Sequence, residues 1–320
     1  MYQDSSVKPQ TPAEIKGLSK SQKYFFILLA GATCIGFAPI FAKLAVDTDK
    51  IGGAGISPAA VAFWRLALSS PIFFLLAKRA SFKTQKRKNT KKSWLLFLPG
   101  LFFALDLSFW HLSFEYTSVA NATLEANMAT LIVAIFGFFV LKERLDARFL
   151  LGLIVSLAGL FLLLYEGFRI DKTTLIGDML GIATAFCYAG YILSLKALTR
   201  YYKVAHIMFM TTLVGSGAIF LGLFIYYGHS GYGVLLPTNK DTWIWLVLLA
   251  LLAQVFGQAF IAKGMSGLPV SFSAISLFWQ PVMTAILGFL ILDQNLSMLQ
   301  IFCGFLILFG IFLAKKGIVK

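Results

Sequence analysis

Charged side chains are scarce in this chain of 320 residues: Asp, Glu, Lys and Arg together make up 13%, whereas 58% of the residues are hydrophobic. A water-soluble domain usually carries about twice that share of charge. Ten apolar runs are each long enough to cross a hydrocarbon core ~30 Å thick as a helix. The sequence therefore predicts an all-α integral membrane protein with ten transmembrane helices. The predicted spans are 24–46, 57–77, 94–114, 117–141, 147–165, 174–195, 205–227, 242–262, 269–292 and 297–314.

Residues that carry redox, metal or nucleotide chemistry are also few. The three cysteines, Cys34, Cys187 and Cys303, all fall inside predicted spans, so we expect small apolar fillers rather than a disulfide framework. Three well-separated histidines give no metal site, and no Gly-x-x-x-x-Gly-Lys-Ser/Thr loop is present to bind ATP. The sequence thus predicts neither a cofactor nor an ATP-driven pump.

Positive charge is distributed unevenly over the loops. The tail at 1–23, the loop at 78–92 and the C-terminal segment at 315–320 hold many of the 28 Lys and Arg residues. The opposite loops hold few. The positive-inside rule therefore places both termini in the cytoplasm and the protein in the plasma (cytoplasmic) membrane. Anionic lipids explain the net charge of +14, so the lipid bilayer rather than a nucleic acid is the expected partner.

Two stretches of the chain repeat one another at an offset of 151 residues. Residues 137–159 begin and end with glycine and contain Leu-Lys-Glu-Arg-Leu, and residues 288–310 do the same with Leu-Asp-Gln-Asn-Leu. The chain thus contains two five-helix repeats, 24–166 and 167–320. Because five is odd, the second repeat enters the membrane from the opposite side.

Inverted repeats are typical of secondary transporters, in which one half rocks against the other around a central site. A duplication that merely enlarged a helical bundle is the alternative. Lys43 and Lys196, near the ends of the first and sixth spans, are expected on opposite sides of the membrane.

Several short motifs together resemble the EamA-type family of the drug/metabolite transporter superfamily. They are Gly36-x-x-Pro39, Phe63-Trp64-Arg65, the segment from Tyr116 to Ala122, Lys142-Glu143-Arg144-Leu145 with Gly152 and Gly159, and Pro281 with Gly310. Gln294 and Thr130 depart from the pattern, at positions where the family often has Glu and Pro. The resemblance implies a ten-span carrier that exports or imports small organic solutes.

Ionisable side chains inside the spans are costly in lipid and usually face a bundle interior or a water-filled cavity. Arg65 lies about eight residues into the second span, roughly 12 Å deep, and needs a carboxylate. Asp106 and Glu125 lie at comparable depth, so one could neutralise Arg65 and the other could attract a cationic substrate. A structural ion pair is the alternative. Asp178 is expected to stabilise the first turn of the sixth span.

Other polar and aromatic residues complete the predicted site. Asn121 and Glu125 lie four residues apart on one helix face, as do Gln254 and Gln258. Pro281 should kink the ninth span and free a carbonyl group there. The predicted substrate-binding residues are Asp106, Trp110, Asn121, Glu125, Tyr188, Tyr191, Gln254, Gln258, Trp279 and Gln280, and the structural or gating residues are Arg65, Glu143 and Pro281.

The sequence as a whole predicts a secondary transporter that moves a small organic metabolite by alternating access. An amino acid or amine derivative is the preferred substrate class, on the strength of Asp106 and Glu125. Protons or a counter-substrate could drive the transport, and the sequence leaves that choice open. An intramembrane enzyme that uses the two carboxylates, or a channel, is the alternative. Glu143 is expected to form part of a charge network that latches the cytoplasmic gate.

Overall fold

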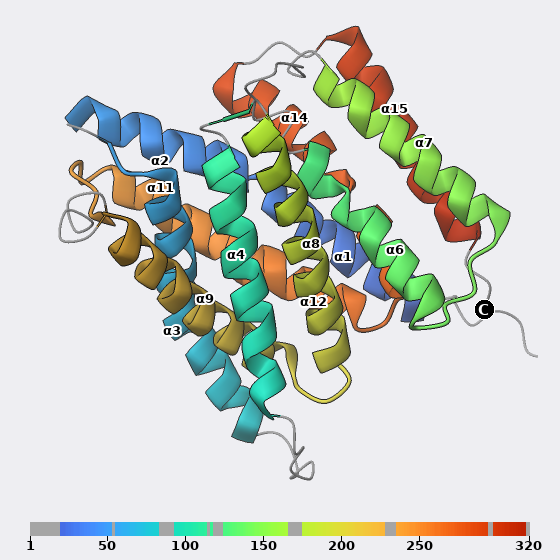
Figure 1. Cartoon of the computed structure of the whole chain (residues 1–320), viewed down its shortest axis with the longest axis horizontal. Helices are drawn as coiled ribbons and strands as arrows, with labels where there is room; N and C mark the ends of the chain where they lie inside the picture. The colour runs from blue at the N-terminus through green and yellow to red at the C-terminus, as the bar shows by residue number, and fades with distance from the viewer. Residues whose placement is uncertain are drawn as a thin grey trace, which may run out of the picture.

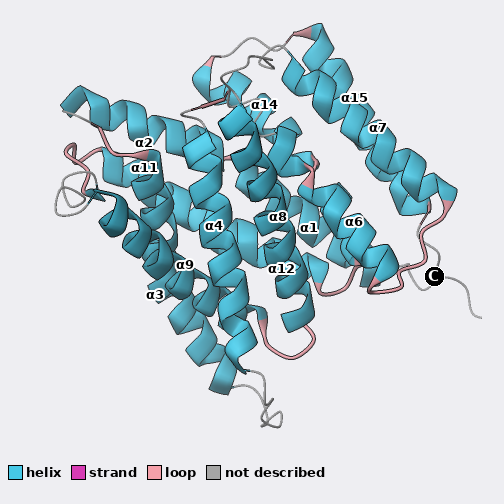
Figure 2. Cartoon of the chain, in the orientation of Figure 1, coloured by secondary structure: helices cyan, strands magenta, loops and turns pink. Residues whose placement is uncertain are grey.

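The computed structural model describes residues 20–52, 55–82, 93–113, 116–117, 124–165, 175–227, 235–293 and 297–317. These residues form helices joined by short turns, and none of them belongs to a β-strand (Figure 2). Eight helical stretches are long and apolar enough to cross a membrane, and two shorter apolar helices lie at Trp94–Trp110 and Leu124–Phe139. The protein is therefore a multi-pass α-helical membrane protein.

The helices of the first half follow the predicted spans, with interruptions. They are α1 (Lys20–Gly36), α2 (Ala38–Gly52), α3 (Pro58–Phe82), η1 (Ser93–Phe97), α4 (Leu98–Ser113), α6 (Ala129–Phe139) and α7 (Ala147–Leu164). A turn of helix at 124–127 precedes α6.

The second half is built in the same manner. Its helices are α8 (Leu175–Leu198), α9 (Val204–Tyr227), α11 (Thr242–Leu248), η5 (Leu249–Gln258), α12 (Ala259–Met265), α13 (Val270–Ser276), α14 (Trp279–Leu292) and α15 (Met298–Lys316). The segment η5 is wound as a π-helix, a wider turn that often occurs at functional sites.

The helices pack in pairs that join the two halves of the chain (Figure 1). α7 packs along α15, α3 along α9, α4 along α8, and α1 along α12 and η5. The pairing is symmetric between the halves. When each predicted span is replaced by the span five places away, the pairs α7–α15 and α3–α9 remain the same, and the pair α4–α8 becomes the pairing of α1 with α12 and η5. In Figure 1, α7 and α15 form a separate antiparallel layer beside the other helices.

Small residues bring α7 and α15 into close contact. A Cβ atom on Gly152 would lie 2.9 Å from Cα of Ala314, and a Cβ atom on Gly310 would meet the backbone N of Ser156 at 2.6 Å. The hydroxyl of Ser156 donates a hydrogen bond of 3.3 Å to the carbonyl of Ile307, the residue 151 positions further along. Close backbone approach at small residues is the usual way in which helices associate in lipid.

The repeated Leu-x-x-x-Leu segments share a backbone conformation at their second residue. Lys142 and Asp293, again 151 residues apart, have φ angles of 54° and 52° in the left-handed region. Asp293 caps α14 by donating its N–H to the carbonyl of Gly288. Glu143, the residue after Lys142, donates its N–H to Gly137 at 2.9 Å. The two motifs thus share a helix-terminating conformation.

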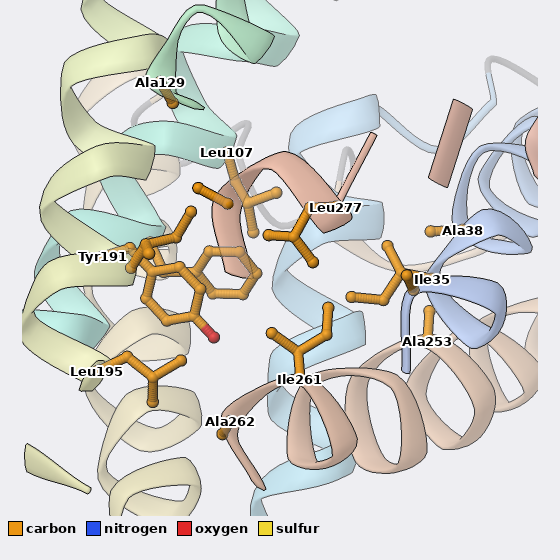
Figure 3. Packing of buried hydrophobic residues seen from close by; sticks show 14 of the residues in the cluster. Ile35, Ala38, Leu107, Ala129, Tyr191, Leu195, Ala253, Ile261, Ala262 and Leu277 are labelled. Carbon is orange, nitrogen blue, oxygen red and sulfur yellow. The ribbon is translucent and has the colours of Figure 1, made fainter. Parts of the chain in front are cut away.

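Large apolar side chains cover much of the outer surface, as lipid contact requires. Ile225, Phe139 and Phe305 are each about 70% exposed. The interior contains a continuous apolar cluster that Figure 3 shows between α1, α4, α8 and α12. Ile35, Leu107 and Ile261 are among its members, and they surround the site described next.

Candidate functional site

A cavity of about 540 Å³ lies among α2, α3, α4, α8, η5 and α14. Apolar and aromatic side chains, such as Leu107 and Trp110, form much of its wall. It reaches the exposed side chain of Lys43 at one end of the molecule. The volume lies in the range of sites that enclose small organic ligands.

Three helix interruptions surround this cavity. Phe37 separates α1 from α2 next to Pro39, and residues 277–278 separate α13 from α14 just before Pro281. Met128 breaks the helix in front of α6. Proline supplies no N–H for a helical hydrogen bond, so the preceding turn is free to unwind. Discontinuous helices that line a cavity mark the binding site in many transporters.

Arg65 and Asp106 are charged side chains of the cavity wall. The Nε of Arg65 donates to Oε1 of Gln254 at 2.9 Å, and its guanidinium lies 5.7 Å from the ring centre of Phe103. Among the described residues, neither charged group has an ion-pair partner within 4.0 Å. The expected carboxylate partner of Arg65 is therefore replaced by an amide oxygen, which leaves the positive charge available to the cavity.

Tyr191 and Gln258 form a buried hydrogen bond at the bottom of the site. The Tyr191 hydroxyl donates to Oε1 of Gln258 at 2.8 Å, and its ring stacks on Phe103 with centroids 4.6 Å apart. Figure 3 shows the Tyr191 ring projecting from α8 towards Ile261. Gln258 lines the cavity, whereas Tyr191 is 1% exposed and lies behind the wall. Tyr188, whose ring lies 6.0 Å from that of Tyr191, also lines the cavity.

Glu125 lies apart from the cavity lining. Its side chain packs directly on Gly181 of α8 and interacts with the carboxyl group of Asp178. Asp178 also accepts a hydrogen bond of 3.1 Å from the hydroxyl of Thr117. The two predicted carboxylates are thus separated: Asp106 lines the cavity and Glu125 lies at the contact between the turn before α6 and the start of α8.

Trp279 joins two helices behind the cavity wall. Its indole Nε1 donates to the hydroxyl of Thr33 on α1 at 2.9 Å. Close by, the hydroxyl of Thr284 donates to the carbonyl of Gly36 at 3.1 Å, next to the break between α1 and α2. Gln254 is fully buried behind Arg65. The predicted residue Asn121 lies outside the residues that the structure describes.

Two polar side chains, Glu143 and Lys196, link helices at the end of the molecule remote from Lys43. Glu143 accepts hydrogen bonds from the backbone N–H groups of Val270 at 2.7 Å and of Ser271 at 3.1 Å. The Nζ of Lys196 donates to the carbonyls of Met265, at 2.5 Å, and Leu268. A negative group at a helix start and a positive group at a helix end are both electrostatically favourable. Together they hold the turn between α12 and α13 against α6 and α8.

Comparison with known proteins identifies a family that matches this chain. The family described as the EamA-like transporter family matches the chain over residues 22–165 and again over residues 175–315. The chain belongs to the EamA-like transporter family. This EamA-like protein is 28% identical over 271 residues to an uncharacterised transporter of Archaeoglobus fulgidus, covering 82% of the chain and 90% of the relative. It is 23% identical over 294 residues to the uncharacterised transporter YyaM of Bacillus subtilis, covering 89% and 93%.

One solved crystal structure shares the fold of this EamA-like protein. It superimposes with a TM-score of 0.72 over 92% of the chain and 97% of the other protein, at 18% sequence identity. The family and its named relatives support a transporter role, and the resemblance to the drug/metabolite transporters is confirmed.

The cavity of this EamA-like transporter brings together part of the predicted site and adds residues that sequence reasoning missed. Of the predicted residues it is lined by Arg65, Asp106, Trp110, Tyr188, Gln258, Gln280 and Pro281. Asn127, Thr184 and Thr284 also line it. Thr184 follows one turn after Gly181 on α8, and a single threonine in an apolar helix carries no signal of a cavity in the sequence. Asn127 lies beside the helix break at Met128, and the sequence treated as one regular helix does not predict that break.

Proposed function

We propose that this EamA-like protein is a secondary transporter that carries a small amine-bearing organic metabolite across the plasma membrane by alternating access. Asp106 is the observation that carries the proposal. Its carboxylate lines the cavity without a neighbouring cation within ion-pair distance among the described residues. A protonated amine of the substrate would supply the missing positive partner, and buried charges in membrane proteins normally have one.

An inverted arrangement of two five-helix repeats, in ten spans, supports the rocking mechanism. The helix pairs exchange with one another when the halves are exchanged, and Ser156 meets Ile307 at the centre of the α7–α15 pair. Lys142 and Asp293 end equivalent helices in the same left-handed conformation. Two halves with equivalent packing can adopt two mirrored arrangements of similar energy, which alternating access requires.

The charge distribution of the loops supports an outward-open state for this structure. With the termini in the cytoplasm, Lys43 faces outward and the bonds of Glu143 and Lys196 close the cytoplasmic side. The cavity reaches Lys43, so the arrangement corresponds to a carrier that is open outward. Movement to the inward-open state would break the contacts of Glu143 with Val270 and of Lys196 with Met265.

The experiment is uptake of a panel of amines and amino acids into proteoliposomes at several pH gradients, with wild type, Asp106→Asn and Glu125→Gln. We expect saturable uptake that Asp106→Asn lowers at least tenfold and that Glu125→Gln leaves within about twofold, because only Asp106 lines the cavity. Unchanged uptake in Asp106→Asn, with both variants folded, would contradict the site. Flux without saturation would indicate a channel, and chemically altered products would indicate an enzyme.

The orientation has its own test. Single cysteines replacing Lys43 and Lys203 in a cysteine-free background should react with a membrane-impermeant maleimide from opposite sides. Both side chains are exposed, so labelling reports the compartment rather than burial. Labelling from the same side would remove the inverted topology and the rocking mechanism together.

A further inference from the structure

We infer that the lysines at the ends of α12 and α15 bind the headgroup of an anionic phospholipid beside the start of α1. They are Lys263 in the last turn of α12, and Lys315 and Lys316 in the last turn of α15. All three side chains are exposed. The lipid would lie on the outer surface of the helices and not in the cavity, so this site is separate from the proposed transport of a metabolite.

Two consecutive aromatic residues of α1 lie beneath two of the ammonium groups. The Nζ of Lys263 lies 5.7 Å from the ring centre of Tyr24, and the Nζ of Lys315 lies 4.4 Å from that of Phe25. An ammonium group over an aromatic face is attracted by the negative charge of the ring face. Because Tyr24 and Phe25 are neighbours in one helical turn, the two positive charges flank the same short stretch of α1.

Within the part of the chain that the structure describes, these positive charges have no carboxylate partner. No oxygen of a described Asp or Glu lies within 4.0 Å of any of the three ammonium groups. Asp146 lies against Gly317, the residue after α15, but its Oδ1 caps the start of α7. Phosphate oxygens would supply the negative partner, and basic residues between helix ends are a common place for anionic headgroups to bind.

An apolar surface suited to acyl chains lies next to the lysines. Phe312 and Phe309, one and two turns before Lys316 on α15, are 50% and 54% exposed. The Nζ of Lys316 lies 4.4 Å from the ring centre of Phe312, so the charge and the apolar surface adjoin. Phe26 on α1 is 52% exposed. A phospholipid matches both parts of this surface, whereas a free phosphate ion would use only the lysines.

The start of α1 also packs on the turn between α12 and α13. A Cβ atom on Gly267 in this turn would lie 2.1 Å from the ring of Tyr24. Phe25 stacks on Phe272 of α13, with ring centroids 5.5 Å apart. The same turn is held against α6 and α8 by the side-chain bonds described above. A headgroup bound by the lysines would therefore tie α1, α12 and α15 together and stabilise the closure of this end.

The test measures the binding of cardiolipin and of phosphatidylcholine to the full chain in a neutral detergent, by native mass spectrometry. Cardiolipin has negative phosphate groups without a compensating positive charge, whereas phosphatidylcholine is zwitterionic. Wild type should bind cardiolipin about tenfold more tightly than phosphatidylcholine. The pair Lys263→Gln with Lys315→Gln should weaken cardiolipin binding about tenfold and leave phosphatidylcholine binding unchanged.

The pair Lys78→Gln with Arg79→Gln is the matched control. Both side chains are exposed near the end of α3, at the same end of the molecule, and their loss removes the same charge. Cardiolipin binding should stay within about twofold of wild type. The pair Lys263→Arg with Lys315→Arg keeps both positive charges and should restore cardiolipin binding, which separates loss of the site from loss of folding.

Hydrogen exchange measured by mass spectrometry reports the effect on the closure. Cardiolipin should slow exchange several-fold in the peptide that covers the turn between α12 and α13 of wild type. It should have no such effect in the pair Lys263→Gln with Lys315→Gln. Neither measurement needs a transported substrate, so the lipid site can fail while the transport function stands, and the reverse.

Three results would contradict the inference. Equal binding of cardiolipin and phosphatidylcholine by wild type would show that the site does not recognise an anionic headgroup. Equal losses in the two glutamine pairs would show that cardiolipin responds to the net charge of the protein and not to Lys263 and Lys315. Unchanged exchange in the turn when cardiolipin is bound would remove the link between the lipid and the closure.

Discussion

The carboxylate of Glu143 accepts the backbone N–H of Val270 at 2.7 Å, so a side chain at the end of the fourth predicted span holds the start of the ninth. The second carboxylate oxygen accepts the N–H of Ser271. Both contacts join the first half of the chain to the second. In the sequence Glu143 is expected to belong to a charge network. In the structure its hydrogen-bond partners are backbone N–H groups, and its charge also interacts with that of Lys196.

Glu143→Gln should loosen this closure. The amide keeps one acceptor oxygen but turns an NH₂ group towards a backbone donor, and it removes the negative charge. Hydrogen bonds to charged groups contribute about 1.5–3 kcal/mol, so opening should become roughly tenfold or more frequent. Hydrogen exchange measured by mass spectrometry should rise in the peptide that covers α13.

Asp146→Asn is the matched control for Glu143→Gln. Asp146 caps α7 by accepting the N–H groups of Arg148 and Phe149, at the same end of the molecule. Its loss should raise exchange at the start of α7 and leave α13 unchanged. Equal protection of α13 in Glu143→Gln and wild type would show that the carboxylate does not hold the gate.

Lys196→Met should weaken the same closure from the opposite side of the turn. The Nζ of Lys196 bonds to the carbonyls of Met265 and Leu268, and methionine fills similar volume without a donor. Fewer molecules would then be open outward, so the KM for external substrate should rise several-fold. Lys203→Met, which removes an exposed bond to the carbonyl of Ala80, should leave the KM unchanged. An unaltered KM in Lys196→Met would contradict the gate.

The sequence predicts position along a helix more directly than direction around it. Residue counts along the apolar runs predict Arg65, Asp106 and Glu125 at similar depth. The helix is interrupted at Met128, and Glu125, in the turn before it, packs on Gly181 instead of facing Arg65. Which neighbour a helical side chain faces depends on tertiary packing. The hydrophobic periodicity of a single sequence does not contain that information.

The turns were more predictable than the cavity wall. The equivalence of the segments at 141–145 and 292–296 follows from a repeated pattern, and Lys142 and Asp293 share a left-handed conformation. The role of Gln254 as partner of Arg65 has no such signal, because it joins residues 189 positions apart. A glutamine on an apolar helix gives the same sequence pattern whether it lines a cavity or, like Gln254, forms a buried hydrogen bond with a residue of the cavity wall.

Gly152→Leu should destabilise the protein through the α7–α15 contact. Any side chain at this position meets the backbone of Ala314 and Gly310. Overpacking in a close contact costs about 1–3 kcal/mol, and here the obstacle is backbone that cannot rotate away. Thermal unfolding in detergent should occur several degrees lower than in wild type.

The control for this contact is a glycine without neighbours. A Cβ atom on Gly217 of α9 has nothing within 4 Å, so Gly217→Leu should unfold at the wild-type temperature or higher, since leucine favours helix over glycine. Equal unfolding temperatures of Gly152→Leu and Gly217→Leu would show that α7 and α15 do not pack as closely as described.

Tyr191→Phe should affect stability and substrate binding in separable ways. The change removes the hydroxyl that donates to Gln258 and leaves a buried amide oxygen without a partner, at a cost of about 1–3 kcal/mol. Gln258 lines the cavity and its amide would then be free to turn, so the KM for the transported substrate should change several-fold. Tyr201→Phe, at an exposed position, should change neither quantity.

The double variant Tyr191→Phe with Gln258→Leu separates the two effects. Removing both partners leaves no buried polar group unmatched, so the unfolding temperature should return towards that of wild type. The amide of Gln258 would be lost from the cavity wall, and the altered KM should persist. If stability and KM recovered together, Gln258 would serve only to satisfy Tyr191, and its donor would play no part in substrate binding.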